Sequence, residues 1–273
     1  MNAKEFTFII VSYRSEKLIF NCLKYLPKET CKIVIENSNN FELKKKLEKK
    51  FKNLNCYVMK KNLGYGKANN YAIKKAKTKY VFIINPDVTL NLKIFKTIIN
   101  IIKKEKFTIA GFIEKGDNVD FKNKKIIEKD FVKGFAMIIN KKKIKKYFDE
   151  NIFLYLEEID LCKRIQDQKG RIILLNIQIP HIGGLSHGKW DLEIEKSRNW
   201  HWMWSKFYFN QKHNNYIYAF LITFPNFISS LVKLIFFITI NNKKKINIYR
   251  MRFSGLLNAY LKNKSFYRPY EKN

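Results

Sequence analysis

Two short segments of the sequence bring carboxylates together with neighbours that would fix their position. Asn85-Pro86-Asp87 places an aspartate directly after an apolar run, and the proline restricts the backbone before it. A rigidly held carboxylate suits Mg²⁺ or Mn²⁺ that bridges two phosphate oxygens. An aspartate that only forms a turn after proline would give the same tripeptide, and this segment taken alone favours the turn.

The second segment is acidic and follows an apolar stretch at 153–155. Glu157, Glu158 and Asp160 fall within one helical turn of each other. Crowded carboxylates beside apolar side chains have raised pKa values, and such a group can act as a general base near neutral pH. The alternative is a helix N-terminus, where acidic residues favour the helix dipole and pair with the basic residues that follow.

Two glycine-containing loops add candidate ligands. His181 and His187 lie in HIGGLSHG, where a neutral imidazole could ligate a metal or hydrogen-bond a diphosphate, although exposed loop histidines are common. The loop NLGYGKANN precedes a predicted helix and could present backbone N–H groups to an anion. It lacks the ending of a Walker A motif and is not a G-x-G-x-x-G fingerprint.

The elements around these residues alternate between strand and helix in the first half of the chain. Strands are predicted at 6–13, 31–37, 55–59, 80–84 and 108–112, with amphipathic helices between them. This alternation predicts an α/β fold with a mostly parallel sheet, in which ligands bind beyond the carboxyl ends of strands. Those ends carry Ser12-Tyr13, Glu36-Asn37-Ser38 and Asn85-Pro86-Asp87.

The alternation becomes irregular after about residue 115. Residues 130–140 are predicted as a strand, with 127–131 before it as loop. A turn that leads into a helix is expected over 151–168, and another strand over 171–180. An aromatic cluster near residue 200 marks a change of character, so we expect one domain over 1–205 and a helical tail over 206–273.

The tail contains a nearly continuous apolar run from Tyr216 to Ile240. Its length suffices for a membrane span of about 20 residues, but Pro225 and Lys233 interrupt it. Aromatic residues precede the run and a basic cluster follows it, as lipid headgroups would require. We therefore expect a helix in the membrane interface or a kinked re-entrant pair, and a buried helical hairpin is the alternative.

Composition narrows the class of protein. The 273 residues are 46% hydrophobic and 15% aromatic, which excludes wholesale disorder. The net charge of +31 fits either a polyanionic partner or a lysine-rich base composition. The basic residues form no single patch and no nucleic-acid-reading motif, so we expect no nucleic-acid partner. Four cysteines without metal-ligand spacing, and no signal peptide at the N-terminus, favour a reducing compartment.

Taken in order, these segments resemble the family-two inverting glycosyltransferases, particularly the rhamnosyltransferase-like branch that builds bacterial surface polysaccharides. The resemblance runs from residue 7 to about residue 188 and continues weakly into the tail. It implies a GT-A fold, Rossmann-like with a mostly parallel central sheet, followed by a C-terminal helical membrane-associating segment. The motifs that carry it are VSYRS, ENSNN, NLGYGKANN, YVFIINPDV, KGFAMIINK, FDENIFLYLEEIDLCKR and HIGG-S.

The resemblance also implies residue roles. Glu158 would be the general base, with Glu157 and Asp160 as its rivals, and Asp87 would hold Mg²⁺ or Mn²⁺ with His181 near the diphosphate. Many relatives carry Asp where this chain has Glu36 and Glu158, so the reach of both carboxylates is one methylene longer. The residues implied to bind the donor are Ser12, Tyr13, Glu36, Ser38, Asn62, Gly64, Asn69, Asn85, Gly134 and Phe135.

The implied activity is transfer of a sugar, with rhamnose from a dTDP donor as the best example, to a lipid-linked or polysaccharide acceptor. The implied partners are a nucleotide-sugar donor, that acceptor and an anionic membrane surface. The expected location is the cytoplasmic face of the inner (plasma) membrane, in a peripheral or monotopic arrangement. Two other classes remain open: a basic nucleic-acid-binding protein, and a nucleotide-sugar-binding scaffold whose active site has decayed.

Overall fold

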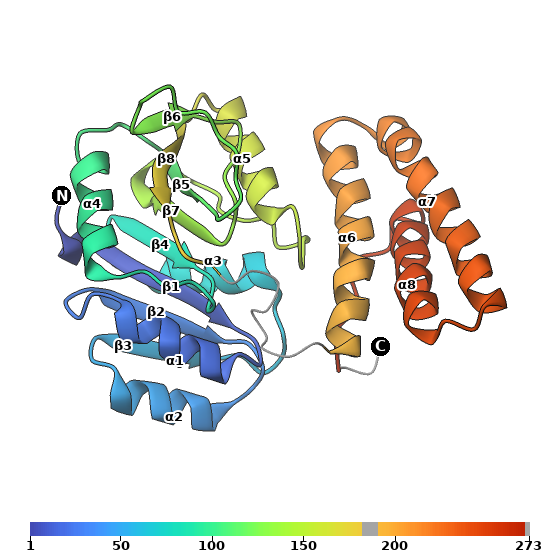
Figure 1. The fold of residues 1–273 in the computed structure, drawn as a ribbon, viewed down its shortest axis with the longest axis horizontal. Coiled ribbons are helices and arrows are strands. Elements are labelled where there is room, and N and C mark those ends of the chain that lie inside the picture. Colours follow the sequence, from blue (N-terminus) through green and yellow to red (C-terminus); the bar gives the residue numbers. More distant parts are fainter. Residues whose placement is uncertain (182–190, 271–273) are drawn as a thin grey trace. The chain divides into compact units, whose positions relative to one another are not determined.

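The computed structural model describes residues 1–181 and 191–270, which form two compact units. The first unit comprises Met1–Asp149 and Glu158–Lys189, and the second comprises Glu150–Glu157 and Trp190–Asn273. Figure 1 shows a sheet flanked by helices in the first unit and helices packed together in the second. The boundary that the sequence predicted at residues 205 and 206 falls inside one of these helices, Leu192–His213.

The first unit contains every strand of the described chain. Its helices are the 3₁₀ turns η1 (Ala3–Glu5) and η2 (Lys141–Lys143) and the α-helices α1 (Glu16–Tyr25), α2 (Phe41–Lys50), α3 (Tyr65–Lys75), α4 (Leu92–Ile102) and α5 (Glu157–Asp167). Its strands are β1 (Phe6–Ser12), β2 (Cys31–Glu36), β3 (Leu54–Val58), β4 (Tyr80–Ile84), β5 (Ile109–Ile113), β6 (Ile126–Glu128), β7 (Ala136–Asn140) and β8 (Ile172–Gln178).

The described strands form one sheet in the order β3-β2-β1-β4-β7-β5-β8-β6. Strands β1 to β4 run parallel to one another, as the helical connections between them require. Strand β7 runs antiparallel to both β4 and β5, so β5 and its parallel neighbour β8 point in the same direction as β4. Six strands, β1, β2, β3, β4, β5 and β8, therefore end at the same edge of the sheet, where β7 begins.

Both faces of the sheet are buried by helices. Alternate residues of β1 separate the faces, because Phe8 and Ile10 belong to one apolar cluster and Ile9 to the other. The cluster around Phe8 takes its helical side chains from α1, α2 and α4, and the cluster around Ile9 takes them from α3 and α5. This three-layer packing holds the strand ends in fixed positions, which is what a binding site at the sheet edge needs.

The irregular segment 114–140 differs from its prediction in two ways. Residues 127–131 were predicted as loop, but Ile126–Glu128 form β6 and pair antiparallel with β8. A three-residue strand is too short to show alternation, so the pattern missed it. The strand predicted over 130–140 is confined to Ala136–Asn140, because the backbone at Gly134 and Phe135 bonds instead to Tyr65 and Asn85.

The second unit is built on α6 (Leu192–His213), α7 (Tyr216–Thr239) and α8 (Lys243–Tyr260). Trp200, Trp204 and Phe207 of α6 are buried in its core with Leu256 of α8. Gly255 is required in this packing, because a Cβ at that position would lie 2.4 Å from the carbonyl oxygen of Trp200.

Helix α7 is the described helix that is long and apolar enough to cross a membrane. It is one continuous helix that contains Pro225, so the predicted re-entrant pair is wrong. The alternative of a buried hairpin is also wrong, since only 11% of its most apolar stretch is buried. The fully buried residues of α7 are small, namely Ala219, Thr223 and Ser230. Phe220 and Phe227 pack partly buried against the core, whereas other large apolar side chains of α7, Ile217, Leu221 and Val232 among them, are exposed.

Candidate active site

The predicted site residues lie at the sheet edge where the parallel strands end. Ser12 ends β1, Glu36 ends β2, and Asp87 follows β4 by three residues. His181, also predicted, follows β8 and pairs with Val88 in an isolated antiparallel bridge, and the structure adds Glu114, which directly follows β5. The rule that polar residues collect at the carboxyl ends of parallel strands is therefore confirmed and extends further than the sequence indicated.

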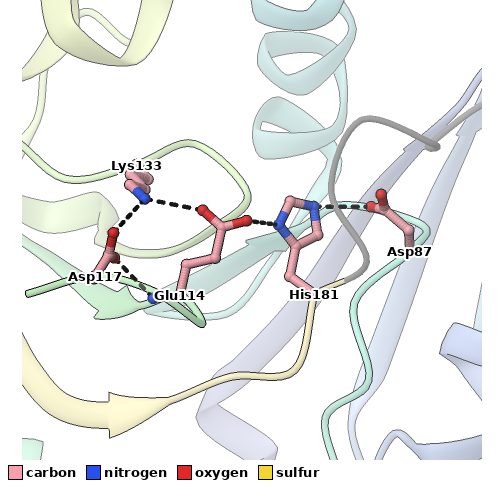
Figure 2. Close-up of polar contacts among 5 residues, drawn as sticks. All are labelled: Asp87, Glu114, Asp117, Lys133 and His181. Atoms are coloured by element: carbon pink, nitrogen blue, oxygen red, sulfur yellow. Dashed lines mark hydrogen bonds and ion pairs between the residues drawn. The ribbon is translucent and has the colours of Figure 1, made fainter.

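Asp87 and His181 form the centre of this edge (Figure 2). The Nε2 atom of His181 lies 3.2 Å from Oδ1 of Asp87, and both side chains are buried. The pair lacks the alignment of a hydrogen bond, and both carboxylate oxygens of Asp87 have no hydrogen-bond partner among the described residues. Nε2 of His181 is equally without one. Buried polar atoms rarely lack a hydrogen-bond partner unless a ligand, an ion or a water molecule binds them.

The other ring nitrogen of His181 is held by a carboxylate. Nδ1 of His181 lies 2.7 Å from Oε1 of Glu114, and Oε2 of Glu114 accepts a hydrogen bond from Nζ of Lys133 at 2.9 Å. Lys133 also donates to Asp117 at 2.6 Å, as the same view shows (Figure 2). A hydrogen bond from Nδ1–H to Glu114 leaves the Nε2 lone pair directed at Asp87.

The charges of this network shift its pKa values. Burial disfavours the charged form of His181, but Asp87 and Glu114 outweigh burial and raise the pKa of the imidazole. Burial likewise acts to raise the pKa of Glu114, but hydrogen bonds from Lys133 and His181 outweigh it and lower that pKa. Glu114 therefore stays ionised, and it orients His181 by accepting the hydrogen bond from Nδ1.

The donor set fits a divalent metal. The oxygens of Asp87 and Nε2 of His181 are the orphaned atoms, and an imidazole whose second nitrogen bonds a carboxylate is the usual form of a metal-bound histidine. The described residues supply two ligands here, and they hold no group of three or more candidate metal-binding side chains. A metal at this place would take its remaining ligands from water or from a bound phosphate.

Gly134 and Phe135 lie beside His181 and Tyr65, and their contact with the donor sugar stays a prediction. The ring of Phe135 stacks on His181, with centroids 4.8 Å apart. The carbonyl oxygen of Gly134 accepts a hydrogen bond from the Tyr65 hydroxyl at 2.6 Å. A Cβ at Gly134 would lie 3.6 Å from the carboxyl carbon of Glu158, so the predicted base faces the backbone beside Gly134.

The three rival carboxylates of α5 differ in their surroundings. Burial raises the pKa of Glu158, which is the change that a general base needs. Asp160 is fully buried and accepts a hydrogen bond at 2.9 Å from Nε of Arg164, whose guanidinium also binds the carbonyl of Lys146. Glu157 is the first residue of α5 and is buried. Asp160 thus has a structural partner, and Glu158 remains the predicted base.

Glu36 is engaged in local structure. Its carboxylate accepts hydrogen bonds from the backbone of Ser38 at 3.1 and 3.2 Å, from the Ser38 hydroxyl, and from the backbone of Asn40 at 2.6 Å. These bonds close the turn that begins α2. Contact of Glu36 with a nucleobase remains a prediction, and it would require one of these bonds to be exchanged. Ser12 is also turned inward, with its hydroxyl 2.9 Å from that of Ser15.

Asn37 joins the ends of β1 and β2 to the glycine loop. Its backbone N–H donates to Ser12, its Nδ2 donates to Asn62 at 2.7 Å, and its Oδ1 accepts from the Leu63 N–H at 2.9 Å. Gly64 then adopts a φ of +78°, a conformation that favours glycine, at the N-cap of α3. No described side chain caps that helix, and the binding of an anion by its first N–H groups stays a prediction.

The remaining predicted residues are Asn69, Asn85, Tyr13 and His187. Asn69 is buried in α3, with Nδ2 donating to the Tyr65 carbonyl and Oδ1 without a partner among the described residues. Asn85 bonds through its backbone N–H to the Phe135 carbonyl at 2.8 Å. Tyr13 follows β1 and is half-buried. His187 lies outside the described residues.

Sequence reasoning missed Glu114, Lys133 and the bridging role of Asn37. Glu114 follows the predicted strand 108–112 by two residues, so the rule applied to Asp87 would have found it. Lys133 carried no signal, because a lysine before a glycine in a lysine-rich chain has no distinguishing pattern.

A family model and a curated relative both match this chain. Residues 7–164 match the model of the family described as "Glycosyl transferase family 2". The rhamnosyltransferase WbbL of Escherichia coli (strain K12) is 26% identical over 199 residues, which cover 58% of this chain and 75% of that protein.

Two solved structures resemble the whole chain at low identity. The structure of S. aureus TarS 1–349 covers 96% of this chain and 93% of its own, with a TM-score of 0.54 and 16% identity. The mannosyltransferase PcManGT from Pyrobaculum calidifontis, in complex with GDP-Man and Mn²⁺, covers 95% and 86%, with a TM-score of 0.59 and 13% identity. At these identities the likeness establishes the fold.

Proposed function

Because the chain belongs to glycosyl transferase family 2, we propose that it is an inverting enzyme that moves a deoxyhexose from a nucleotide donor to a lipid-linked or polysaccharide acceptor. The GT-A fold predicted from the sequence is confirmed, and glycosyltransferase activity follows from the family. The observation that carries the proposal is the buried pair of Asp87 and His181, whose facing atoms have no hydrogen-bond partner among the described residues.

The proposed reaction is a single displacement. Glu158 accepts the proton of an acceptor hydroxyl, and that oxygen attacks the anomeric carbon of the donor in line with the departing diphosphate. A new C–O bond forms as the anomeric C–O bond to phosphate breaks, and the configuration inverts. Burial around Glu158 favours this role because it raises the proton affinity of the carboxylate.

Asp87 and His181 would hold the divalent metal, Mg²⁺ or Mn²⁺, whose charge stabilises the departing nucleoside diphosphate. Glu114 orients His181 for this purpose. The complex of PcManGT with GDP-Man and Mn²⁺ supports divalent metal use in this fold. Asn85 stands where many relatives carry a further aspartate, so Asp87 and His181 are the ligands that the proposal needs.

The donor would lie across the carboxyl ends of β1, β2 and β4. The uncapped start of α3 after Gly64 would receive the diphosphate, and Gly134 and Phe135 would border the sugar. Rhamnose carried by dTDP is the first donor to test, because the relative WbbL is named a rhamnosyltransferase.

The helical unit would place the enzyme on the cytoplasmic face of the inner membrane. Helix α7 buries small residues and exposes large apolar side chains, the arrangement of helices that pack in lipid. The basic run Lys243-Lys244-Lys245 follows it, where anionic headgroups would lie. Full-length protein should bind anionic vesicles more strongly than neutral ones, and salt should release part of it. Equal binding to both would contradict the electrostatic part of this proposal.

The function is tested by thermal-shift titration with a panel of nucleotide sugars, with and without Mn²⁺. A ligand present at about 100 times its Kd should stabilise the protein by about 2.7 kcal/mol. Release of nucleoside diphosphate in the presence of bacterial membranes then separates an enzyme from a binding scaffold. Donor binding without release would indicate a decayed active site. Stabilisation by oligonucleotides but by no nucleotide sugar would favour the nucleic-acid class.

A further inference from the structure

The helical unit contains a pocket of its own, apart from the sheet edge. Its volume is about 380 Å³, within the range of small-molecule sites. The floor is apolar and buried, and the rim is polar and basic. The residues that line it are Glu150, Asn151, Trp204, Phe207, Tyr208, Gln211, Ala259, Lys262, Asn263, Lys264, Ser265 and Arg268.

The floor of this pocket is rigid. Trp204 and Tyr208 lie one helical turn apart on α6 and stack with their rings 4.9 Å apart. The indole N–H of Trp204 donates to the carbonyl of Asn263 at 3.0 Å, and the Tyr208 hydroxyl accepts from Asn151 at 3.2 Å. Both aromatic residues therefore have fixed orientations, and neither ring needs to move for the pocket to stay open.

The rim carries more positive than negative charge. Lys262, Lys264 and Arg268 are basic, whereas Glu150 is the acidic residue among the lining side chains. Arg268 is held in place, because it donates to the carbonyls of Ser265 and Tyr267 and its guanidinium lies 3.8 Å from the centroid of Phe153. An anionic ligand with polar oxygens suits this rim, and phosphate is the anion that flexible lysines commonly bind.

One lysine of the rim lies at the N-terminal end of the apolar helix. Nζ of Lys262 lies 5.5 Å from the ring of Tyr216, the first residue of α7. Helix α7 exposes large apolar side chains along its length, including Ile217, Leu221 and Val232. The helical unit thus combines a basic pocket with an exposed apolar strip on the helix that Lys262 contacts. The molecule that matches both parts is amphiphilic, with a phosphate at one end and a hydrocarbon chain at the other.

We propose that this pocket binds the phosphate-bearing head of the lipid-linked acceptor while α7 contacts its hydrocarbon chain. The inference rests on the proposed function, which requires an acceptor that resides at the membrane. It adds a second binding site, formed by α6, α8 and the residues after α8, to the donor site of the first unit. The lysines of the rim then serve acceptor binding rather than general attraction to lipid.

The test compares two double variants with the same loss of charge. K262Q/K264Q changes the rim, and K142Q/K143Q removes two exposed lysines of η2 in the first unit that do not line the pocket. Full-length proteins are titrated with farnesyl diphosphate in neutral phosphatidylcholine nanodiscs. Each lysine near a lipid phosphate contributes about 1 kcal/mol, so the rim variant should bind about 30-fold more weakly. The control variant should bind as the wild type does.

Three further readouts decide between the explanations. Equal weakening in both variants would overturn the pocket, because general electrostatics would then suffice. If K262Q/K264Q weakens binding to phosphatidylglycerol vesicles as much as to farnesyl diphosphate, the pocket binds phospholipid headgroups and the acceptor assignment is wrong. Thermal shifts with nucleotide sugars should be unchanged in both variants. A wild type that binds no nucleotide sugar would contradict the proposed function, while the farnesyl diphosphate result would still decide the pocket.

Discussion

Replacing Asp87 by Asn tests the metal assignment with little change of shape. The substitution keeps the volume of the side chain and removes its charge. The carboxylate is buried and accepts no hydrogen bond from the described residues, so its charge is unfavourable unless a cation is bound or His181 is protonated. At a pH above the raised pKa of His181 and in the absence of metal, Asp87→Asn should therefore not lower the melting temperature.

The size of the effect follows from binding linkage. Mn²⁺ with a nucleoside diphosphate at about 100 times the Kd should stabilise the wild type by about 2.7 kcal/mol. The first unit has about 180 residues, for which about 1 kcal/mol changes Tm by about 2–4 °C. The wild type should gain about 5–11 °C. If loss of one of two protein ligands weakens binding about 100-fold, the variant keeps only about 0.4 kcal/mol, which is about 1 °C.

The assay is a thermal melt with and without Mn²⁺ and nucleoside diphosphate, read by intrinsic fluorescence. Asp117→Asn is the matched control, because Asp117 belongs to the same network but bonds Lys133 instead of facing the metal position. It should keep the full ligand-induced shift. A shift in Asp87→Asn as large as in the wild type would refute the metal assignment. A metal-free variant that melts far below the wild type would instead make Asp87 a structural residue.

Three other substitutions have distinct expected outcomes. Glu158→Gln should lower turnover about 10²–10⁴-fold and leave the donor-induced thermal shift unchanged. Burial raises the pKa of Glu158 above its usual 4.5, and the base must be ionised to accept a proton. Wild-type activity should therefore fall as the pH drops through that raised pKa. Because the pKa is raised, ionisation of Glu158 lowers the stability of the fold as the pH rises, so Glu158→Gln should not lower Tm at neutral pH. Normal turnover in Glu158→Gln would instead assign the base to Glu157 or Asp160. Glu114→Gln should weaken Mn²⁺ binding about 10–100-fold by calorimetry, and an unchanged affinity would show that His181 needs no orienting carboxylate. Arg164→Met should lower the free energy of unfolding in urea by about 3–5 kcal/mol by leaving Asp160 buried without its ion pair, and a loss below 1 kcal/mol would contradict that.

The sequence predicted the parallel half of the sheet because its elements repeat with clear periods. The strands at 6–13, 31–37 and 80–84 alternate with amphipathic helices, and this pattern alone brings Ser12, Glu36 and Asp87 to one edge. The family motifs then supplied Gly134, Phe135 and His181, which composition and spacing could not have identified.

The remainder depends on contacts that are distant in the sequence. The antiparallel direction of β7 follows from how the irregular segment 114–135 returns to the sheet, and no local pattern encodes that return. The link from His181 to Glu114 spans 67 positions, and that from Glu114 to Lys133 spans 19. The direction of α7 side chains was equally hidden, because a helix that is apolar all round shows no preferred face until its neighbours are known.

The outward-facing apolar strip of α7 also governs how the protein behaves in solution. Copies that carry a net charge of +31 repel one another, and this repulsion opposes contact between their exposed apolar strips. The screening length falls from about 10 Å at 0.1 M salt to about 3 Å at 1 M, so added salt removes the repulsion and leaves the apolar attraction. The purified protein should consequently be colloidally stable in dilute buffer and self-associate as salt is raised. A mild detergent that coats α7 should abolish that association.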